Sequence, residues 1–207
     1  GLHRINSLSG VVRTIWPLIQ NLFDDEVSTI SMLDIASGSG EIPIKLASRA
    51  RSEGLQIDLV GCDFSPLART VALEKCQDNN IRMSYETIDV TRGGLTDLGR
   101  FDVVMCNLFL HHLKEDSVIK VIRDSARITN RLLIINDLRR DWVNLLLAKV
   151  VPRILTRSKV VHIDAVRSVR AAYSEKELRF LAESAGLEQF RVRKAFPRRM
   201  VLTWSPP

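Results

Sequence analysis

The strongest constraint on the fold is a regular alternation of short apolar runs with segments of helical periodicity. Near-continuous apolar runs indicate strands that are buried on both faces, and the segments between them indicate helices that cover those faces. The alternation therefore predicts an α/β fold with a doubly wound, mostly parallel, seven-stranded sheet. The expected strands are 31–36, 56–62, 82–88, 101–107, 131–136, 187–194 and 199–204. The expected helices are 8–23, interrupted by Pro17, then 41–53, 66–79, 115–128 and one from a capping box at Ser174 through Ala185.

The chain is expected to form a single domain over residues 1–207, because 207 residues suit one core. Residues 1–30 are expected to form an N-terminal helical cap. Residues 138–172 break the alternation and read as one or two helices, broken near Pro152, that form an inserted lid after the fifth strand. Three cysteines without a CxxC pair disfavour a disulfide framework. With no apolar run of bilayer length and no secretory signal, the expected compartment is the reducing cytoplasm.

The positive charge is concentrated in one segment. Residues 138–170 hold eight basic and two acidic residues, which matches the net charge of +6 of the whole chain. A second basic cluster lies at 191–199. A localised basic patch attracts nucleic acid, anionic lipid or an anionic substrate, and it can also be a merely solvated face. The segment 138–170 thus allows peripheral membrane contact.

A glycine-containing loop follows the first expected strand, in the sequence Leu33-Asp34-Ile35-Ala36-Ser37-Gly38-Ser39-Gly40. Glycines at a strand-to-helix turn permit a tight bend and a close approach of a ligand. The second strand ends at Asp63, and an acid at that position can accept hydrogen bonds from ribose hydroxyls. Loop and acid together indicate a cofactor that contains adenosine. The alternative role of Asp63 is to cap the helix that starts after it.

The details of the loop favour S-adenosylmethionine over a phosphate-containing cofactor. Pro43 stands where a dinucleotide fingerprint has a small residue, and Glu41 would place a negative charge near a pyrophosphate. No Walker lysine follows, so a nucleotide P-loop is excluded. The acidic Asp34 suits a ligand that carries an ammonium and a sulfonium and no phosphate.

These residues resemble the class I S-adenosylmethionine-dependent methyltransferases, from about residue 30 to the C-terminus. The sequence is most similar to the small-molecule group that includes ubiquinone/menaquinone-type enzymes and polyketide or phenol O-methyltransferases. The resemblance implies a Rossmann-like sheet. Ala36 departs from the usual first glycine, and Thr129-Asn130 replaces the usual Pro-Gly-Gly turn. The cofactor-binding residues that the resemblance implies are Asp34, Ala36, Gly38, Gly40, Asp63, Phe64, Asp89, Val90 and Asn107.

Histidines are the candidate general bases, because an imidazole titrates near neutral pH. His111 follows the fourth strand, and His162 lies near Asp164 in the inserted segment. The alternatives are a structural His111 and a solvent-facing His162. The remaining candidates, which are expected to bind the substrate, are His112, Arg139, Arg140, Arg167 and Arg170.

The expected function is methyl transfer to a hydroxyl of an aromatic or polyketide-like small molecule. The alternatives are C-methylation of a quinone or quinol precursor, methylation of nucleic acid or protein through the basic patch, and a non-catalytic cofactor-binding role. Nucleic acid is disfavoured because Asn107-Leu108-Phe109-Leu110 lacks the Pro-Pro-aromatic signature of many base methylases. The cysteines and histidines show no metal-ligand spacing, so no metal is expected. The sequence gives no indication of an oligomeric state.

Overall fold

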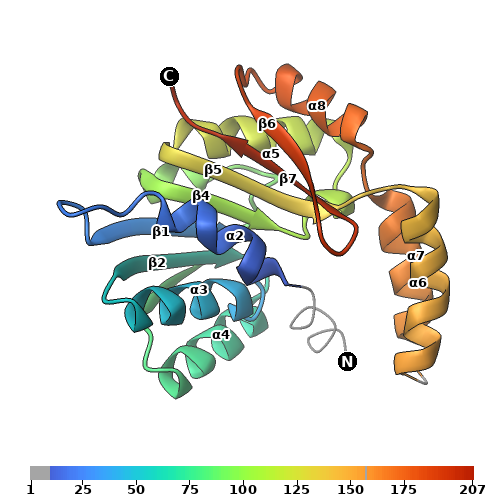
Figure 1. Cartoon of the computed structure of the whole chain (residues 1–207), viewed down its shortest axis with the longest axis horizontal. Helices are drawn as coiled ribbons and strands as arrows, with labels where there is room; N and C mark the ends of the chain where they lie inside the picture. Colours follow the sequence, from blue (N-terminus) through green and yellow to red (C-terminus); the bar gives the residue numbers. More distant parts are fainter. Residues whose placement is uncertain (1–9, 157) are drawn as a thin grey trace.

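A seven-stranded sheet of order β3-β2-β1-β4-β5-β7-β6 runs through the molecule (Figure 1). The computed structural model describes residues 10–156 and 158–207. The strands are β1 (Thr29–Ile35), β2 (Gln56–Asp63), β3 (Met83–Thr87), β4 (Phe101–Asn107), β5 (Thr129–Leu138), β6 (Arg191–Ala195) and β7 (Arg199–Trp204). The first five strands pair in parallel, and β7 pairs antiparallel with both β5 and β6. The predicted Rossmann-like α/β sheet is confirmed.

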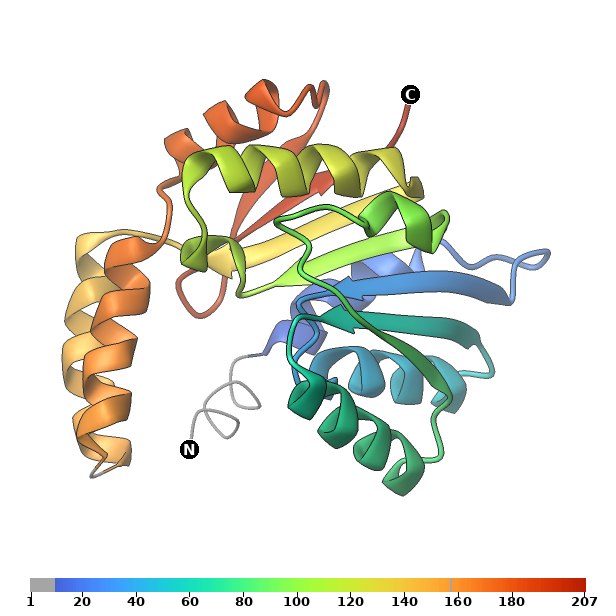
Figure 2. The same cartoon turned by 180° about the vertical axis from the view of Figure 1, so that it is seen from behind.

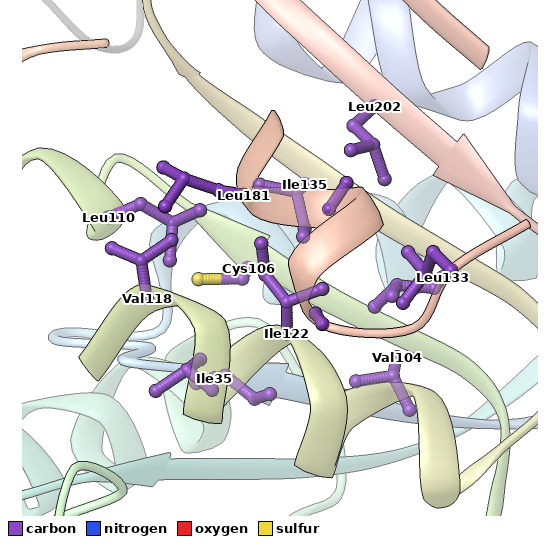
Figure 3. Packing of buried hydrophobic residues seen from close by; sticks show 14 of the residues in the cluster. Ile35, Val104, Cys106, Leu110, Val118, Ile122, Leu133, Ile135, Leu181 and Leu202 are labelled. Carbon is purple, nitrogen blue, oxygen red and sulfur yellow. The ribbon is translucent and has the colours of Figure 1, made fainter. Parts of the chain in front are cut away.

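Helices cover both faces of the sheet, as the apolar strands predict. One face packs on α2 (Val11–Gln20), α3 (Glu41–Ser52) and α4 (Pro66–Asp78), and the other on α5 (Glu115–Arg127) and α8 (Glu175–Ser184). Each face of the sheet has its own hydrophobic core: the first lies under α2 and α3, and the second lies under α5 and α8. Along β1, Met32 packs in the first core, whereas Leu33 and Ile35 pack in the second. Figure 3 shows the second core, where Ile122 and Leu181 of the covering helices meet Ile135 of the sheet.

The strand order reverses between the neighbouring strands β1 and β4. After β1 the chain adds β2 and β3 on one side of the sheet, and after β4 it adds β5 on the other side. In open parallel sheets, ligands bind outside the carboxyl ends of the strands at this point of reversal. The fold therefore places the loops after β1, β2, β3 and β4 around one site.

Two prolines do not break the helices that contain them. Pro17 lies inside α2, whose buried face of Val11, Ile15 and Ile19 holds the helix together by packing. Pro152 lies inside α6 (Trp142–Leu155), and the chain leaves the helical conformation only at Thr156. The expected break near Pro152 was wrong by four residues. The start of the first expected helix, residues 8 and 9, and residues 1–9 of the expected cap lie outside the described residues.

Other boundaries differ from the prediction where tertiary packing decides them. β5 extends two residues beyond each end of the expected strand 131–136, because β4 and β7 pair along its added ends. β6 begins at Arg191 and not at residue 187, since Leu187 is buried in the core beside α8. The capping box is confirmed: Ser174 Oγ accepts from the Glu177 amide, and Glu177 Oε2 accepts from the Ser174 amide at 2.7 Å.

The inserted segment after β5 forms a helical hairpin of α6 and α7 (Lys159–Ala171), which projects from one end of the sheet (Figures 1 and 2). The helical nature and position of this insertion are confirmed. The side of α7 that faces the body contacts the short 3₁₀ turn η2 (Leu110–His112) that follows β4. Among the helices of the described ranges, none is long and apolar enough to cross a bilayer.

Candidate active site

The loop between β1 and α3 is built from residues in the left-handed region of backbone space. Ala36, Gly38 and Gly40 have φ values of 53°, 53° and 67°. Glycine adopts this region without cost, whereas an alanine is strained there by roughly 1 kcal/mol. Leu108, which follows β4 across the same site, also has a positive φ of 52°. Strained non-glycine residues cluster at functional sites, and both of these residues line one pocket.

Three side chains hold the loop in place. Asp63 Oδ2 accepts from the Gly38 amide at 3.0 Å, Tyr85 Oη donates to the Gly38 carbonyl at 2.7 Å, and Lys75 Nζ donates to Ser39 Oγ at 2.8 Å. Asp63 Oδ1 also accepts from the Ser65 amide at 3.0 Å, but the cap of α4 is Ser65, whose hydroxyl accepts from Ala68. Asp63 therefore ties the loop to the end of β2.

A pocket of about 500 Å³ opens at the carboxyl ends of β1 to β4. A pocket of this size is typical of a small-molecule site. It contains five of the predicted cofactor residues, one predicted substrate residue and five further residues. These are Ala36, Asp63, Phe64, Asp89 and Val90, then His112, and finally Ile88, Thr91, Leu108, Phe109 and Leu113.

Asp34 lies buried beneath the pocket wall, two residues before Ala36. Its Oδ1 accepts from Asn107 Nδ2 at 3.5 Å, and Asn107 Oδ1 accepts from Asn136 Nδ2 at 3.1 Å. Burial raises the pKa of the Asp34 carboxyl to about 7, against the lowering influence of the Ser37 and Asn107 side chains, and the charge of Asp63 raises it further. Such a carboxylate is poised to become fully ionised when a cation binds nearby.

Asp89 stands exposed at the rim of the pocket. Its Oδ1 accepts from the amide and the hydroxyl of Thr91 at 3.1 and 2.6 Å, and Oδ2 pairs with Arg92 Nε at 3.1 Å. The hydrogen bond from the Thr91 side chain is the largest influence that lowers the pKa of Asp89. This side chain is therefore ionised at neutral pH and held in a fixed position.

The two histidines after β4 occupy different environments. His111 is buried, and its Nδ1 lies 2.6 Å from Asp137 Oδ1, at the carboxyl end of β5. His112 lines the pocket, with its ring centroid 4.0 Å from that of His111. Partial burial and, second, the neighbouring His111 lower the pKa of His112. The His112 imidazole is therefore neutral at pH 7 and able to accept a proton.

The remaining predicted residues lie outside this pocket. His162 is at the turn end of the hairpin, where its Nε2 lies 2.8 Å from the Thr156 carbonyl and 3.2 Å from the Pro152 carbonyl. Arg139 pairs with Asp141 at 2.6 Å, and Arg140 pairs with Glu177. The other two predicted arginines, Arg167 and Arg170, are exposed on α7. Among the histidines and arginines that were predicted to lie near the acceptor, His112 is the one that lines the described pocket.

Sequence reasoning missed three residues that shape the site. Tyr85 and Lys75 hold the loop, and period-2 alternation in strand 82–88 predicts for Tyr85 only that it is buried. Asp137 orients His111. A signal for Asp137 does exist, because the polar pair Asn136-Asp137 ends an apolar strand at the edge where ligands bind.

The pocket fits the adenosyl part of S-adenosylmethionine. The Asp63 carboxylate lies in its wall, an aromatic ring, Phe64, stands exposed beside it, and apolar residues complete the lining. The Ser37 hydroxyl in the same loop is buried beside the Asp34 carboxyl, whose pKa it lowers. No lysine or arginine is among the described lining residues, so the pocket offers no cation for a pyrophosphate.

Comparison with known proteins supports this interpretation. Residues 32–131 match the family model described as a methyltransferase domain. The chain is an S-adenosylmethionine-dependent class I methyltransferase. Its fold and the pocket at the point of strand reversal agree with this family, and S-adenosylmethionine is its cofactor.

The methyltransferase has distant relatives in sequence and in structure. A curated relative is the ubiquinone/menaquinone biosynthesis C-methyltransferase UbiE of Rickettsia bellii, which is 23% identical over 77% of this chain and 68% of the relative. Magnesium protoporphyrin IX methyltransferase from Synechocystis, solved with bound SAH, has a TM-score of 0.64 at 18% identity, over 95% of this chain and 81% of that one. An O-methyltransferase family 2 protein from Planctomyces limnophilus, in complex with apigenin, has a TM-score of 0.64 at 14% identity. The match to this last protein covers 86% of the methyltransferase and about half, 51%, of that chain.

We expect Asp63→Ala to weaken the binding of S-adenosylmethionine at least roughly tenfold, because hydrogen bonds to a charged acceptor contribute about 1.5–3 kcal/mol. Isothermal titration calorimetry with the purified protein measures this affinity. Asp58→Ala is the matched control, since Asp58 is exposed on the same strand and lies outside the pocket. Unchanged affinity in a folded Asp63→Ala protein would remove Asp63 from the cofactor site.

Proposed function

We propose that the methyltransferase transfers the methyl group of S-adenosylmethionine to a hydroxyl oxygen of a small aromatic or polyketide-like molecule. The observation that carries this proposal is a pocket that combines an apolar wall with one neutral imidazole. Phe109 and Leu113 offer apolar surface for a planar acceptor, and His112 stands beside them. The same pocket holds Asp63 and Asp89, the residues that we assign to the cofactor.

The protein's own contribution to the reaction is alignment and proton transfer. S-adenosylmethionine, when bound, supplies a methyl group that is already activated by its sulfonium, so positioning of the acceptor does much of the work. A phenol has a pKa of about 10 and is mostly protonated at neutral pH. His112 accepts the hydroxyl proton, and its lowered pKa keeps the imidazole in the basic form.

His111 has a positioning role in this proposal. The contact of 2.6 Å between His111 Nδ1 and Asp137 Oδ1 fixes the orientation of the His111 ring. Its ring lies against that of His112, tilted by 42°. The pair Asp137–His111 thereby limits the rotation of η2 and keeps His112 in the pocket wall.

C-methylation of a quinol precursor is the second candidate, favoured by the curated relatives that are named as C-methyltransferases. A screen with methyl-labelled S-adenosylmethionine over phenols, quinol precursors, RNA and protein distinguishes the candidates. An O-methyl ether, identified by mass spectrometry and NMR, supports the proposal. A new carbon–methyl bond supports the alternative, and label found only in RNA or protein would overturn both.

We expect His112→Ala to lower the turnover of the identified phenolic acceptor by roughly 10²-fold, the contribution of a positioned general base. The wild-type rate should be constant from pH 7 to 8 and should fall only in more acidic solution, because protonation of His112 removes the base and partial burial lowers the pKa of His112 from the usual histidine value. The variant should lose this dependence on pH. Steady-state kinetics across pH, with calorimetric affinity for S-adenosylmethionine as a check on folding, measure both effects.

His162→Ala provides the direct comparison, because His162, with His111, is a candidate base from the sequence, and its ring contacts backbone carbonyls of the hairpin turn. If His162→Ala lowers turnover and His112→Ala does not, the assignment of the base to His112 is wrong. If neither variant is slower, alignment alone carries the reaction.

A further inference from the structure

A continuous apolar stripe runs along the outside of the α6–α7 hairpin. On α6 it recurs every three to four residues and consists of Trp142, Leu146, Leu147, Val150, Val151 and Ile154; Val160 and Ile163 extend it onto α7. Trp142 and Ile154, at the two ends of α6, are each 77% exposed, and Val160 is 75% exposed. An exposed apolar patch of this extent marks a surface that binds something.

The opposite side of each helix already has a partner. Ala148 of α6 and Val161 and Val169 of α7 are buried, and the two helices pack against each other. Asp164 lies on the side of α7 that faces His112. Its negative charge partly offsets the lowering of the His112 pKa. The stripe therefore lies on the exposed side of the two helices, on a hairpin that projects from the rest of the molecule (Figure 2).

Cations flank the stripe. Lys149 and Arg153 continue the row that Trp142 and Leu146 begin on α6, and Arg167 and Arg170 continue the exposed row of α7. All four are exposed, and within residues 10–156 and 158–207 none of them pairs with a carboxylate. The basic segment expected from the sequence thus becomes a defined surface, apolar along its centre and positive at its margins.

We propose that this hairpin face docks on an anionic lipid bilayer. An amphipathic helix with an apolar stripe and basic margins lies in the plane of the interface, where each cation near an anionic surface contributes favourably. α6 has 14 residues and a length of about 21 Å, so it can lie on a bilayer but is too short to cross one. Charge complementarity selects this occupant over a second copy of the chain, since pairing two such faces would place their cations against one another.

Docking in this way would bring the pocket close to the bilayer, because α7 contacts the turn η2 that carries His112. The membrane surface and the proposed methyl acceptor are independent inferences. The binding test below uses protein, lipid and salt, and it needs no acceptor.

The test is sedimentation of the whole chain with vesicles of phosphatidylcholine, prepared with and without phosphatidylglycerol as the anionic lipid. We expect strong binding to the anionic vesicles at low salt and weaker binding at physiological salt, because the Debye length falls from about 30 Å at 0.01 M to about 8 Å at 0.15 M. Trp142 fluorescence should shift to shorter wavelength on binding. The pair of substitutions Trp142→Ser and Ile154→Ser should weaken binding at least roughly tenfold, given that burying a large apolar side chain contributes about 1.5–3 kcal/mol.

Phe180→Ser is the matched control, because Phe180 is similarly exposed but lies on α8. It should leave vesicle binding unchanged, and the affinity of each variant for S-adenosylmethionine reports that it is folded. Lys149→Gln with Arg153→Gln should weaken binding to anionic vesicles alone. The proposal is overturned if the wild type does not bind anionic vesicles or binds neutral vesicles equally well. It is overturned likewise if the Trp142→Ser/Ile154→Ser protein binds anionic vesicles as tightly as the wild type. It is also overturned if light scattering shows that the wild type is a dimer and that the Trp142→Ser/Ile154→Ser protein is a monomer, since the face would then join two copies of the chain.

Discussion

Asp34→Asn should stabilise the cofactor-free protein at pH 8 by about 2–4 kcal/mol and weaken the binding of S-adenosylmethionine roughly tenfold. The two effects have opposite directions because the buried carboxylate is unfavourable for the fold and favourable for a cationic ligand. Asn has nearly the same shape, and its side-chain oxygen can still accept from Asn107. The substitution therefore removes a charge and little else.

The pH dependence follows from the direction of the shift. The pKa of Asp34 in the folded state is about 7, well above the ordinary value of 3.8 that the carboxyl has in the unfolded chain. The folded state thus binds the proton more tightly, and this group lowers the stability as the pH rises from about 4 to about 7. Asp34→Asn should lack this loss, so the two proteins should differ little near pH 4 and most above pH 7.

Urea denaturation of the cofactor-free proteins at pH 5 and pH 8 measures the stability, and calorimetry between pH 6 and pH 8 measures the affinity. Wild-type affinity should rise with pH over this range, because the bound cation draws the Asp34 proton away; the variant's affinity should not. Asp25→Asn, on an exposed loop, is the matched control. If Asp34→Asn destabilises the protein at pH 8, the carboxylate is held by favourable contacts and the proposed conflict does not exist.

The sequence predicts the strands of this fold well because parallel strands carry their own signal. β1, β2 and β4 are short apolar runs, of which β2 and β4 end in polar residues at the ligand edge, and β4 matches its expected bounds at both ends. The predicted ends of a strand are wrong where pairing with a neighbouring strand determines its length. The added ends of β5 pair with β4 and β7, and no local pattern contains that information.

The cofactor side of the candidate site is also local in sequence. Asp34 and Asp63 lie at the carboxyl ends of β1 and β2, and Asp89 follows β3, so their positions on parallel strands predict that they converge at one edge of the sheet. The supports of the loop come from elsewhere: Lys75 lies 36 residues from the Ser39 hydroxyl that it contacts, and Tyr85 lies 47 residues from Gly38. Such contacts depend on how the helices and strands pack, which periodicity does not specify.

The acceptor side depends on the hairpin, whose orientation periodicity does not determine. The amphipathic pattern of 138–170 predicts helices and an apolar face but not which way that face turns. In the structure the apolar stripe of α6 faces outward, and His162 lies at the turn. A lid over the acceptor would cover that apolar side, and the lid over residues 138–172 stays a prediction.

Asp137→Ala should lower the stability by about 3–5 kcal/mol, the cost of breaking a buried ionic network by removing one partner. Asp137 is buried and accepts from His111 Nδ1 and Leu138 N, each at 2.6 Å, and from His111 N at 3.3 Å. Its negative charge also acts on Arg199, where burial lowers the guanidinium pKa to about 10 and Asp137 opposes that lowering. The substitution leaves buried donors without an acceptor and removes a negative charge that acts on the buried Arg199 guanidinium.

Arg199→Met separates the two parts of this loss in a double-mutant cycle. Met fills a similar volume without a charge, so the Asp137→Ala/Arg199→Met protein should be less destabilised than the sum of the single variants. A coupling of about 1–3 kcal/mol, from urea denaturation of all four proteins, would assign that share to the charge pair. The rest of the stability that Asp137→Ala removes belongs to the hydrogen bonds that fix His111. This part of the loss should also be seen when Asp137→Ala is made in the Arg199→Met protein. Strict additivity would mean that Asp137 stabilises the fold through His111 and Leu138 alone, and that Arg199 is held by other contacts.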